Sequence, residues 1–269
     1  MLPEPATPAG RSGLTALLAE PARGVVAVDF DGTLAPIVPR PEDARPADGA
    51  IDALRVLAHR VGTVAVVTGR PAEVVVELGG LRDVARLVVL GHYGLQRWAD
   101  GALTGPPPAP GVQVARDRLP DLLVAAPAGV TVEDKHHSLV VHTRQALDPA
   151  GALARLRQPL ARLATDCGLE LVPGRFVLEL RPPGIDKGGA LRALVEERAA
   201  AAVVFVGDDL GDLPAYDAIE ALRRDGVPGV TVCSSSEEVE ALRERADLVL
   251  DGPAAVVQFL LALAAAIGD

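Results

Sequence analysis

The chain has 269 residues, of which 49% are hydrophobic and 23% are charged, and its formal net charge is −10. This composition excludes a disordered chain, which requires few apolar side chains and a high charge density, and it allows one large α/β domain or two smaller ones. The negative charge, without any basic run, predicts that neither nucleic acid nor an anionic membrane is a partner.

The two cysteines and the apolar segments indicate in which cellular compartment the protein is expected. Cys167 and Cys233 stand apart from other cysteines and histidines, which disfavours a disulfide framework and a zinc site and fits a reducing compartment. The first residues lack a basic stretch followed by an apolar core, so no secretion signal is expected. The longest apolar segment, 253–267, is too short to span a bilayer and predicts a terminal helix. We therefore expect a cytoplasmic protein without a membrane partner.

The first predicted strand leads directly into two carboxylates. A continuous apolar run from Val25 to Val28 is followed by Asp29 and, two residues later, Asp31. Such a run predicts a strand buried on both faces, which is typical of a parallel sheet covered by helices. Alternate strand residues share a face, so both carboxylates are expected to point the same way at the edge where such sheets bind ligands. Gly32 then allows a sharp turn and the close approach of a substrate.

The dipeptide Asp31-Gly32 also has a simpler interpretation, as the turn of a hairpin. The preceding strand does not alternate polar and apolar residues, however, and the following prolines Pro36, Pro39 and Pro41 are poor members of an antiparallel ladder. The catalytic interpretation is favoured, as a hypothesis that depends on the rest of the chain.

Strands and helices alternate over the next part of the sequence. The expected elements are a helix over 51–59, a buried strand over 62–67, a helix over 71–78, a buried strand over 86–90 and a hairpin over 93–103. This alternation is typical of right-handed βαβ units and a parallel sheet.

The second of these strands ends at Thr68, Gly69 and Arg70, directly before a helix. A hydroxyl and free backbone amides at a helix N-terminus bind phosphate oxygens well. On its own, Thr-Gly after a strand is more often an ordinary turn.

The proline run at 106–110 is the clearest linker, and the pattern changes after it. The expected elements are a helix over 112–125, strands over 130–133 and 138–143, a helix over 149–167, and strands over 170–172 and 175–181. This order indicates a separate small sheet, which ends at the Pro-Pro-Gly of 182–184. The sequence thus predicts a doubly wound core formed by residues 1–107 and 184–269, and an inserted domain formed by residues 108–183.

Three histidines fall in the first hairpin of this inserted domain. Adjacent strand residues point to opposite faces, so His136 and His137 cannot both bind one ion from a strand. We interpret them, together with His142, as turn and sheet residues and not as metal ligands.

The βα pattern resumes at Asp186, with helices over 186–199 and 213–224 and strands over 203–206 and 230–232. Three carboxylates, Asp208, Asp209 and Asp212, follow the strand over 203–206. Like charges at one strand end repel unless a cation offsets them, and ligands that are all oxygen favour Mg2+. An acidic helix start stabilised by the helix dipole is the alternative for one or two of the three.

Lys187 begins the helix that follows the inserted domain. It is one of only two lysines among 26 basic residues, the other being Lys135, which suggests a site that needs a compact charge on a flexible stem. Its ammonium is placed to reach both a phosphoryl oxygen and Asp29. Otherwise it is an exposed lysine at a helix start, where the dipole disfavours a cation.

These motifs together resemble a known group of enzymes. The aspartate pair, Thr68, Lys187 and the acidic cluster occur in the order found in phosphatases of the haloacid dehalogenase superfamily, and the resemblance spans nearly the whole chain. Segments 91–94, 133–144 and 179–188 further resemble the trehalose-6-phosphate phosphatase family. The resemblance implies a Rossmann-like, doubly wound α/β core with an inserted α+β cap domain of the C2 type.

The resemblance also implies a reaction and a set of roles. Trehalose 6-phosphate would be hydrolysed to trehalose and phosphate through an aspartyl-phosphate, with Asp29 as nucleophile, Asp31 as acid and base, and Thr68 and Lys187 as phosphate ligands. The expected Mg2+ ligands are Asp29, the backbone carbonyl of Asp31, Asp208, Asp212 and Asp209. The expected substrate-binding residues are Gly69, Arg70, His92, Glu133, Lys135, Arg144 and Glu179, with Arg175 as a further candidate.

Two rival functions stay open at this point. One is another capped sugar-phosphate phosphatase, acting on sucrose, glucosylglycerol or mannosylglycerate phosphate. The other is a catalytically silent sugar-phosphate-binding domain, because a fold does not fix a function. A dinucleotide-binding enzyme is disfavoured because no Gly-x-Gly-x-x-Gly follows the first strand. The sequence leaves the oligomeric state open.

Overall fold

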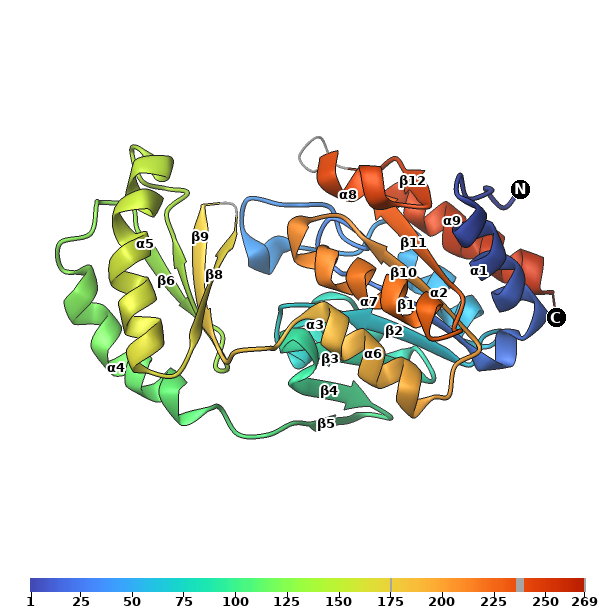
Figure 1. Cartoon of the computed structure of the whole chain (residues 1–269), viewed down its shortest axis with the longest axis horizontal. Helices are drawn as coiled ribbons and strands as arrows, with labels where there is room; N and C mark the ends of the chain where they lie inside the picture. The colour runs from blue at the N-terminus through green and yellow to red at the C-terminus, as the bar shows by residue number, and fades with distance from the viewer. Residues whose placement is uncertain (175, 236–239, 269) are drawn as a thin grey trace. The chain divides into compact units, whose positions relative to one another are not determined.

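The computed structural model describes residues 1–174, 176–235 and 240–268, and the chain divides into two compact units. The first unit comprises Met1–Gly105 and Asp186–Asp269, and the second comprises Pro106–Ile185. Figure 1 shows the elements of each unit.

The first unit, in its described residues, contains an eight-stranded sheet with the order β12-β11-β10-β1-β2-β3-β4-β5. Its strands are β1 (Gly24–Val28), β2 (Thr63–Val67), β3 (Leu87–Gly91), β4 (Gln96–Ala99), β5 (Ala102–Thr104), β10 (Ala202–Gly207), β11 (Gly229–Ser234) and β12 (Leu248–Leu250). The six strands from β12 to β3 in this order pair in parallel, whereas β4 and β5 are antiparallel at one edge. The predicted parallel sheet and the hairpin after it are confirmed.

Both faces of this sheet are packed, as the unbroken apolar strands predict. Along β1, Val26 and Val28 belong to one buried cluster and Val25 and Ala27 to another. Side chains of the helices α1 (Pro8–Ala19), α2 (Ala50–Ala58), α3 (Ala72–Leu78) and α9 (Gly252–Ile267) also belong to the first cluster. Those of α6 (Lys187–Glu197), α7 (Leu213–Arg224) and α8 (Glu240–Arg245) also belong to the second.

Helix α1 was not predicted. Thr7 caps its N-terminus by accepting a hydrogen bond from the Gly10 amide, as is usual for threonine at this position. Gly13 packs so closely on β11 that an added Cβ would lie 2.2 Å from the Gly229 carbonyl oxygen. Close contact with the sheet thus places a glycine where the helical pattern calls for a larger apolar residue.

The second unit, over 106–174 and 176–185, contains a four-stranded antiparallel sheet with the order β6-β7-β9-β8. Its elements are α4 (Pro110–Leu123), β6 (Thr131–Asp134), β7 (Leu139–His142), α5 (Pro149–Asp166), β8 (Glu170–Gly174) and β9 (Val177–Arg181). The predicted order of helix, two strands, helix, two strands is confirmed.

One face of this small sheet packs on the two helices of the unit. Leu139 and Val141 of β7 and Leu178 and Leu180 of β9 join side chains of α4 and α5 in a separate buried cluster. Because strand side chains alternate, the intervening residues of these strands point to the opposite face. We call this the outer face, and it carries Glu133, Ser138, Val140, His142 and Glu179.

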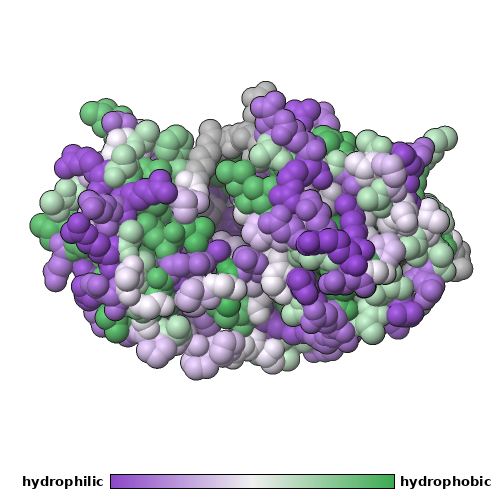
Figure 2. Space-filling model, in the orientation of Figure 1, coloured by the Kyte–Doolittle hydropathy of each residue, from purple (hydrophilic) through white to green (hydrophobic). Residues whose placement is uncertain are grey.

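The surface is consistent with this layered packing. On the side shown in Figure 2, hydrophilic residues are spread over both units and alternate with smaller apolar areas. Among the described residues, none of the helices has both the length and the hydropathy needed to cross a membrane.

Candidate active site

The site lies where neighbouring parallel strands end. Asp29 follows β1, Thr68 follows β2 and Asp208 follows β10, and β1 pairs with both β2 and β10. The carboxyl ends of adjacent parallel strands meet at one edge of the sheet, which brings these side chains together. Lys187, the first residue of α6, joins them, while the Asp186 side chain caps that helix by accepting from the Gly189 amide.

Three buried carboxylates form the centre of the site. Each of Asp29, Asp208 and Asp212 offers one oxygen, and these oxygens lie within 4.8 Å of one another. The Lys187 Nζ lies 2.8 Å from Asp29 Oδ1 and 2.7 Å from Asp212 Oδ1. The predicted contact between Lys187 and Asp29 is thus present, and Asp212 shares the same ammonium.

The backbone around the cluster is fitted to the carboxylates. The amides of Asp208 and Asp209 both donate to Asp212 Oδ2, at 2.9 and 3.1 Å. Gly32 has a φ of +76°, and an added Cβ there would lie 1.9 Å from the Asp208 carboxylate. Only glycine suits this position, both for its left-handed backbone and for its lack of a side chain.

The electrostatics of the cluster favour a bound cation. Burial raises the pKa of Asp29 well above its ordinary value; Lys187 opposes this shift, whereas Asp212 and Asp208 add to it. Burial, with the charges of Asp212 and Asp209, also raises the pKa of Asp208, to about 8. For Lys187, burial disfavours the ammonium, but the carboxylates of Asp212 and Asp29 outweigh it and raise its pKa. A divalent cation would offset the surplus of negative charge, and a donor set made of oxygens suits Mg2+.

The side chains of Asp31 and Asp209 lie outside this group of three. Asp209 Oδ1 accepts from the Gly211 amide and forms a capping box with Asp212 at the short turn Leu210–Asp212. Asp31 accepts two hydrogen bonds from Arg70, at 2.6 Å from Nε and 2.7 Å from Nη2. The expected role of Asp31 as a metal ligand involved its backbone carbonyl, which this side-chain pairing leaves unchanged.

Arg70 is held in a fixed position next to Asp31. Its Nη1 donates to the Pro41 carbonyl at 2.8 Å, and its guanidinium lies 5.8 Å from the centre of the Phe30 ring. The Arg70 amide donates to Thr68 Oγ1, and Thr68 is buried. A planar guanidinium bound through two nitrogens orients a carboxylate more strictly than a lysine does. The structure thus places Arg70 in contact with Asp31, the expected acid and base.

The other expected residues of the first unit, Gly69 and His92, pack against the neighbouring loops. Gly69 packs against Tyr93, since an added Cβ would lie 2.6 Å from the Tyr93 hydroxyl. His92 is buried, has a left-handed φ of 47° and donates its amide to the Arg70 carbonyl. Both residues therefore shape the loop that carries Thr68 and Arg70.

The expected sugar-binding residues all lie in the second unit. Glu133 and Glu179 are on the outer face of its sheet, and Lys135 follows β6 at the hairpin. Arg144 is exposed in the turn after β7. Arg175 lies outside the described residues.

Ser234 is a site residue that sequence reasoning missed. It ends β11, is buried, and its hydroxyl donates to the Gly32 carbonyl oxygen at 2.7 Å. Its signal in the sequence is a hydroxyl at the end of an apolar strand, as at Thr68. Thr33, whose Oγ1 lies 3.5 Å from Asp208 Oδ1, was also missed as an individual residue.

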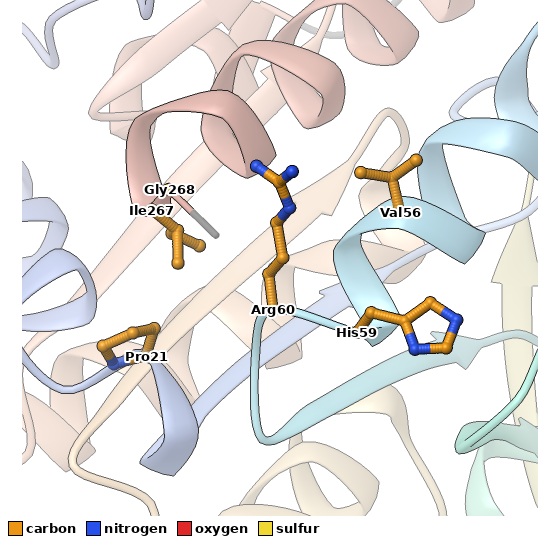
Figure 3. Close-up of a pocket in the computed structure, with 6 residues that line it drawn as sticks. All are labelled: Pro21, Val56, His59, Arg60, Ile267 and Gly268. Atoms are coloured by element: carbon orange, nitrogen blue, oxygen red, sulfur yellow. The ribbon is translucent and has the colours of Figure 1, made fainter.

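A separate hollow of about 470 Å³ lies at the other end of the strands. It is lined by Pro21, Val56, His59, Arg60, Ile267 and Gly268 (Figure 3). Pro21 precedes β1, and His59 and Arg60 precede β2, so the hollow is at the amino ends of these strands. Arg60 reaches towards α9, where its Nη1 donates to the Ala264 carbonyl. Among the described residues, no carboxylate belongs to its lining, and we assign the chemistry to the acidic cluster.

Comparisons with known proteins relate this chain to known phosphatases. A family model described as trehalose-phosphatase matches residues 27–249. Trehalose-6-phosphate phosphatase of Escherichia coli is 31% identical over 72% of this chain and 73% of its own length. Trehalose-phosphate phosphatase of Mycobacterium marinum is 34% identical over 88% of this chain and 60% of its own length.

Some relatives are much longer than this chain. An uncharacterised glycosyl hydrolase of Mycobacterium tuberculosis is 35% identical over 90% of this chain but only 18% of its own length. The chain thus spans from about a fifth to about three fifths of the first curated relatives that it matches.

Solved structures show the same fold. The C-terminal domain of Candida albicans trehalose-6-phosphate phosphatase has a TM-score of 0.78 at 20% identity and covers 98% of this chain and 99% of its own. A haloacid dehalogenase-like hydrolase of Bacteroides thetaiotaomicron has a TM-score of 0.64 at 14% identity, over 89% of this chain and 99% of its own. These likenesses confirm the predicted haloacid dehalogenase-like α/β fold with an inserted cap.

Proposed function

Because the chain belongs to the trehalose-phosphatase family, we propose that it hydrolyses trehalose 6-phosphate to trehalose and phosphate. The observation that carries this proposal is the buried cluster in which Lys187 contacts Asp29 and Asp212 beside Asp208. Phosphoryl transfer depends on positioned charges more than on bonds made by the protein, and this cluster supplies them. A sugar-phosphate-binding domain without catalysis would not need a buried nucleophile.

In the proposed reaction, Asp29 attacks phosphorus in line and forms an aspartyl-phosphate, which water then hydrolyses. Asp31 gives a proton to the departing sugar oxygen and later takes one from the attacking water. Arg70, through its two hydrogen bonds, aims the Asp31 carboxyl group. Thr68 and Lys187 bind the phosphoryl oxygens, where negative charge develops.

We further propose that Mg2+ is the cofactor, held by Asp29, Asp208 and the Asp31 backbone carbonyl, with Asp212 and Asp209 in support. It would supply positive charge that neutralises the phosphate and lowers the barrier to attack by an anion. The three buried carboxylates fit this role because their oxygens already converge.

The two units divide the task in this proposal. Residues 1–107 and 184–269 act as the catalytic core, and residues 108–183 act as the cap that recognises the sugar. Glu133, Lys135 and Glu179, with help from Arg144, hydrogen-bond the sugar hydroxyls. Polar groups in fixed directions reject an analogue that lacks a hydroxyl far better than an apolar pocket does.

The test is the release of phosphate from trehalose 6-phosphate, glucose 6-phosphate and sucrose 6-phosphate, each with Mg2+ and with EDTA. We expect trehalose 6-phosphate to give the highest kcat/KM and EDTA to abolish turnover. The Asp29→Asn variant should lose at least about 10³-fold in kcat, because its amide is a poor nucleophile.

Equal rates on the three esters would disprove the assignment of trehalose 6-phosphate as the substrate, but they would still support a phosphatase activity. Turnover that survives in Asp29→Asn or in EDTA would overturn the mechanism. A higher rate on another sugar phosphate would identify this enzyme as one of the rival capped phosphatases.

A further inference from the structure

The outer face of the second unit holds two carboxylates in one row. In the strand register, Glu133 of β6 lies opposite Val140 of β7, and Val140 lies opposite Glu179 of β9. Neighbouring strands are about 4.8 Å apart, so the two glutamate backbones are about 10 Å apart with one valine between them. Both side chains leave the sheet on the same side.

Each of these carboxylates is bound by a side chain of β7 or of the residue directly before it. The Ser138 hydroxyl donates to Glu179 Oε1 at 2.6 Å, and both side chains are buried. His142 Nε2 lies 2.9 Å from Glu133 Oε2, and both of these side chains are partly exposed. Ser138 and His142 flank Val140 at two residues on either side, so all three point to the outer face.

We propose that Ser138 and His142 are positioning residues, which fix the directions of Glu179 and Glu133 for the hydroxyls of a neutral sugar. This inference rests on the proposed function and concerns how the sugar is distinguished. A free glutamate side chain has several rotamers, and holding it costs entropy when a ligand binds. A neighbour that holds the carboxylate beforehand removes part of that cost.

The alternative is that both contacts only stabilise the sheet, as cross-strand pairs commonly do. A control pair that involves strand β6 but not the outer face distinguishes sheet stabilisation from positioning of the sugar-binding carboxylates. Arg116 of α4 binds Asp134 through two nitrogens, at 2.5 and 3.0 Å. Asp134 is the neighbour of Glu133 on β6 but points to the helix-covered face, so Arg116→Gln removes a similar contact away from the outer face.

The experiment compares two substrates for each variant. The first is the sugar phosphate on which the wild-type enzyme has the highest kcat/KM, and the second is p-nitrophenyl phosphate, which has no sugar. For Ser138→Ala and His142→Ala we expect KM for the sugar phosphate to rise about three- to tenfold, the range of one hydrogen bond. We expect kcat/KM for p-nitrophenyl phosphate to stay unchanged in both variants and in Arg116→Gln.

Conservative substitutions and a double variant provide two further tests of the positioning role. Ser138→Thr keeps the hydroxyl and His142→Gln keeps a donor, so both should recover most of the wild-type KM. In the background of Glu133→Gln, adding His142→Ala should raise KM by less than twofold, because the residue that His142 orients is already altered.

The outcomes separate this inference from the proposed function. If the best substrate is a sugar phosphate other than trehalose 6-phosphate, the proposed function fails, and the same variants test the positioning on that substrate. Additive effects in the double variant, or equal losses on both substrates, would overturn the positioning. It is also overturned if the wild-type enzyme prefers p-nitrophenyl phosphate to every sugar phosphate.

Discussion

At the scale of single residues, the acidic cluster sets catalysis against stability. Asp29, Asp208 and Asp212 are buried with one ammonium, that of Lys187. Removing charged groups from water is unfavourable, and like charges in a small volume add to the cost. The same buried negative charge favours the binding of a divalent cation. The loss of folding stability and the affinity for a metal ion therefore have the same cause.

Asp208 allows this trade-off to be measured. Its carboxyl has a pKa of about 8 in the folded chain against 3.8 ordinarily, so the folded state holds the proton more tightly. The stability that this proton contributes is complete below about pH 4 and is lost as the pH rises through 8. Without metal, Asp208→Asn should therefore melt several degrees above the wild type at pH 8.5, and the difference should shrink at pH 5.5.

Melting curves in EDTA at the two pH values test this, and Mg2+ provides the control. Adding Mg2+ at pH 8.5 should raise the melting temperature of the wild type and leave that of Asp208→Asn nearly unchanged. A difference that is the same at both pH values would show that Asp208 does not titrate in this range.

The residues of the cluster were predictable because their chemistry follows strand ends. Carboxylates after two buried strands, and a rare lysine at a helix start, are visible in the sequence, and a parallel sheet brings such positions together. The pairing of Arg70 with Asp31 was not predictable, since it depends on how the loop after β2 folds next to the loop after β1. Ser234 was missed for a related reason: its partner is a backbone carbonyl 202 residues away.

At the scale of elements, the strand β11 supports the loop that carries the two aspartates. The Ser234 hydroxyl binds the carbonyl of Gly32, and the Gly32 amide donates to the Ala35 carbonyl at 2.7 Å. The turn after Asp31 is therefore fixed both within itself and from two strands away along the sheet.

Ser234→Ala should loosen this turn. It leaves the buried Gly32 carbonyl without that donor, which typically costs about 1–3 kcal/mol of stability. We expect a fall in kcat of roughly tenfold with a smaller change in KM, because a displaced acid and base slows the chemical step more than it weakens binding. Urea unfolding and steady-state kinetics measure the two effects, and Ser234→Cys, which keeps a weak donor, should be intermediate. An unchanged kcat in a destabilised Ser234→Ala would limit the role of Ser234 to folding.

Elements with long apolar runs were predictable, whereas α1, α8 and β12 were not. The valine-rich strands β1, β2 and β10 stand out because every residue is buried. In α1, Gly13 makes room for the sheet and Gly10 makes room for Asp247, which interrupts the apolar pattern of the helix. Helix α8 and strand β12 span only six and three residues. In such segments the tertiary contacts, and not the local pattern, decide the structure.

At the scale of the whole molecule, the two units have separate cores and different connectivity. The second unit is a single stretch of chain, Pro106–Ile185, with its own buried cluster under α4 and α5. Trp98, the only tryptophan of the chain, is buried in β4 of the first unit. Its fluorescence therefore reports on the first unit, whereas circular dichroism reports on the helices of both.

We predict that these two signals separate when the second unit is weakened. Leu160 of α5 is fully buried in that cluster, and Leu160→Ala should destabilise the second unit by about 2–5 kcal/mol. In urea, part of the circular dichroism change should move to lower concentration while the Trp98 transition stays where it is in the wild type. Coincident curves in the variant would show that the units unfold as one cooperative body.

The order of the strands has a consequence for synthesis on the ribosome. Strand β1 pairs with β2 on one side and with β10 on the other, and β10 is made only after the entire second unit. Until then β1 has one edge without a partner. Lys187, Asp208 and Asp212, which surround Asp29 in the folded chain, are also made only after the second unit. An unpaired apolar edge is a template for wrong pairing, so this edge of β1 is open to such pairing until the whole second unit and β10 have been made.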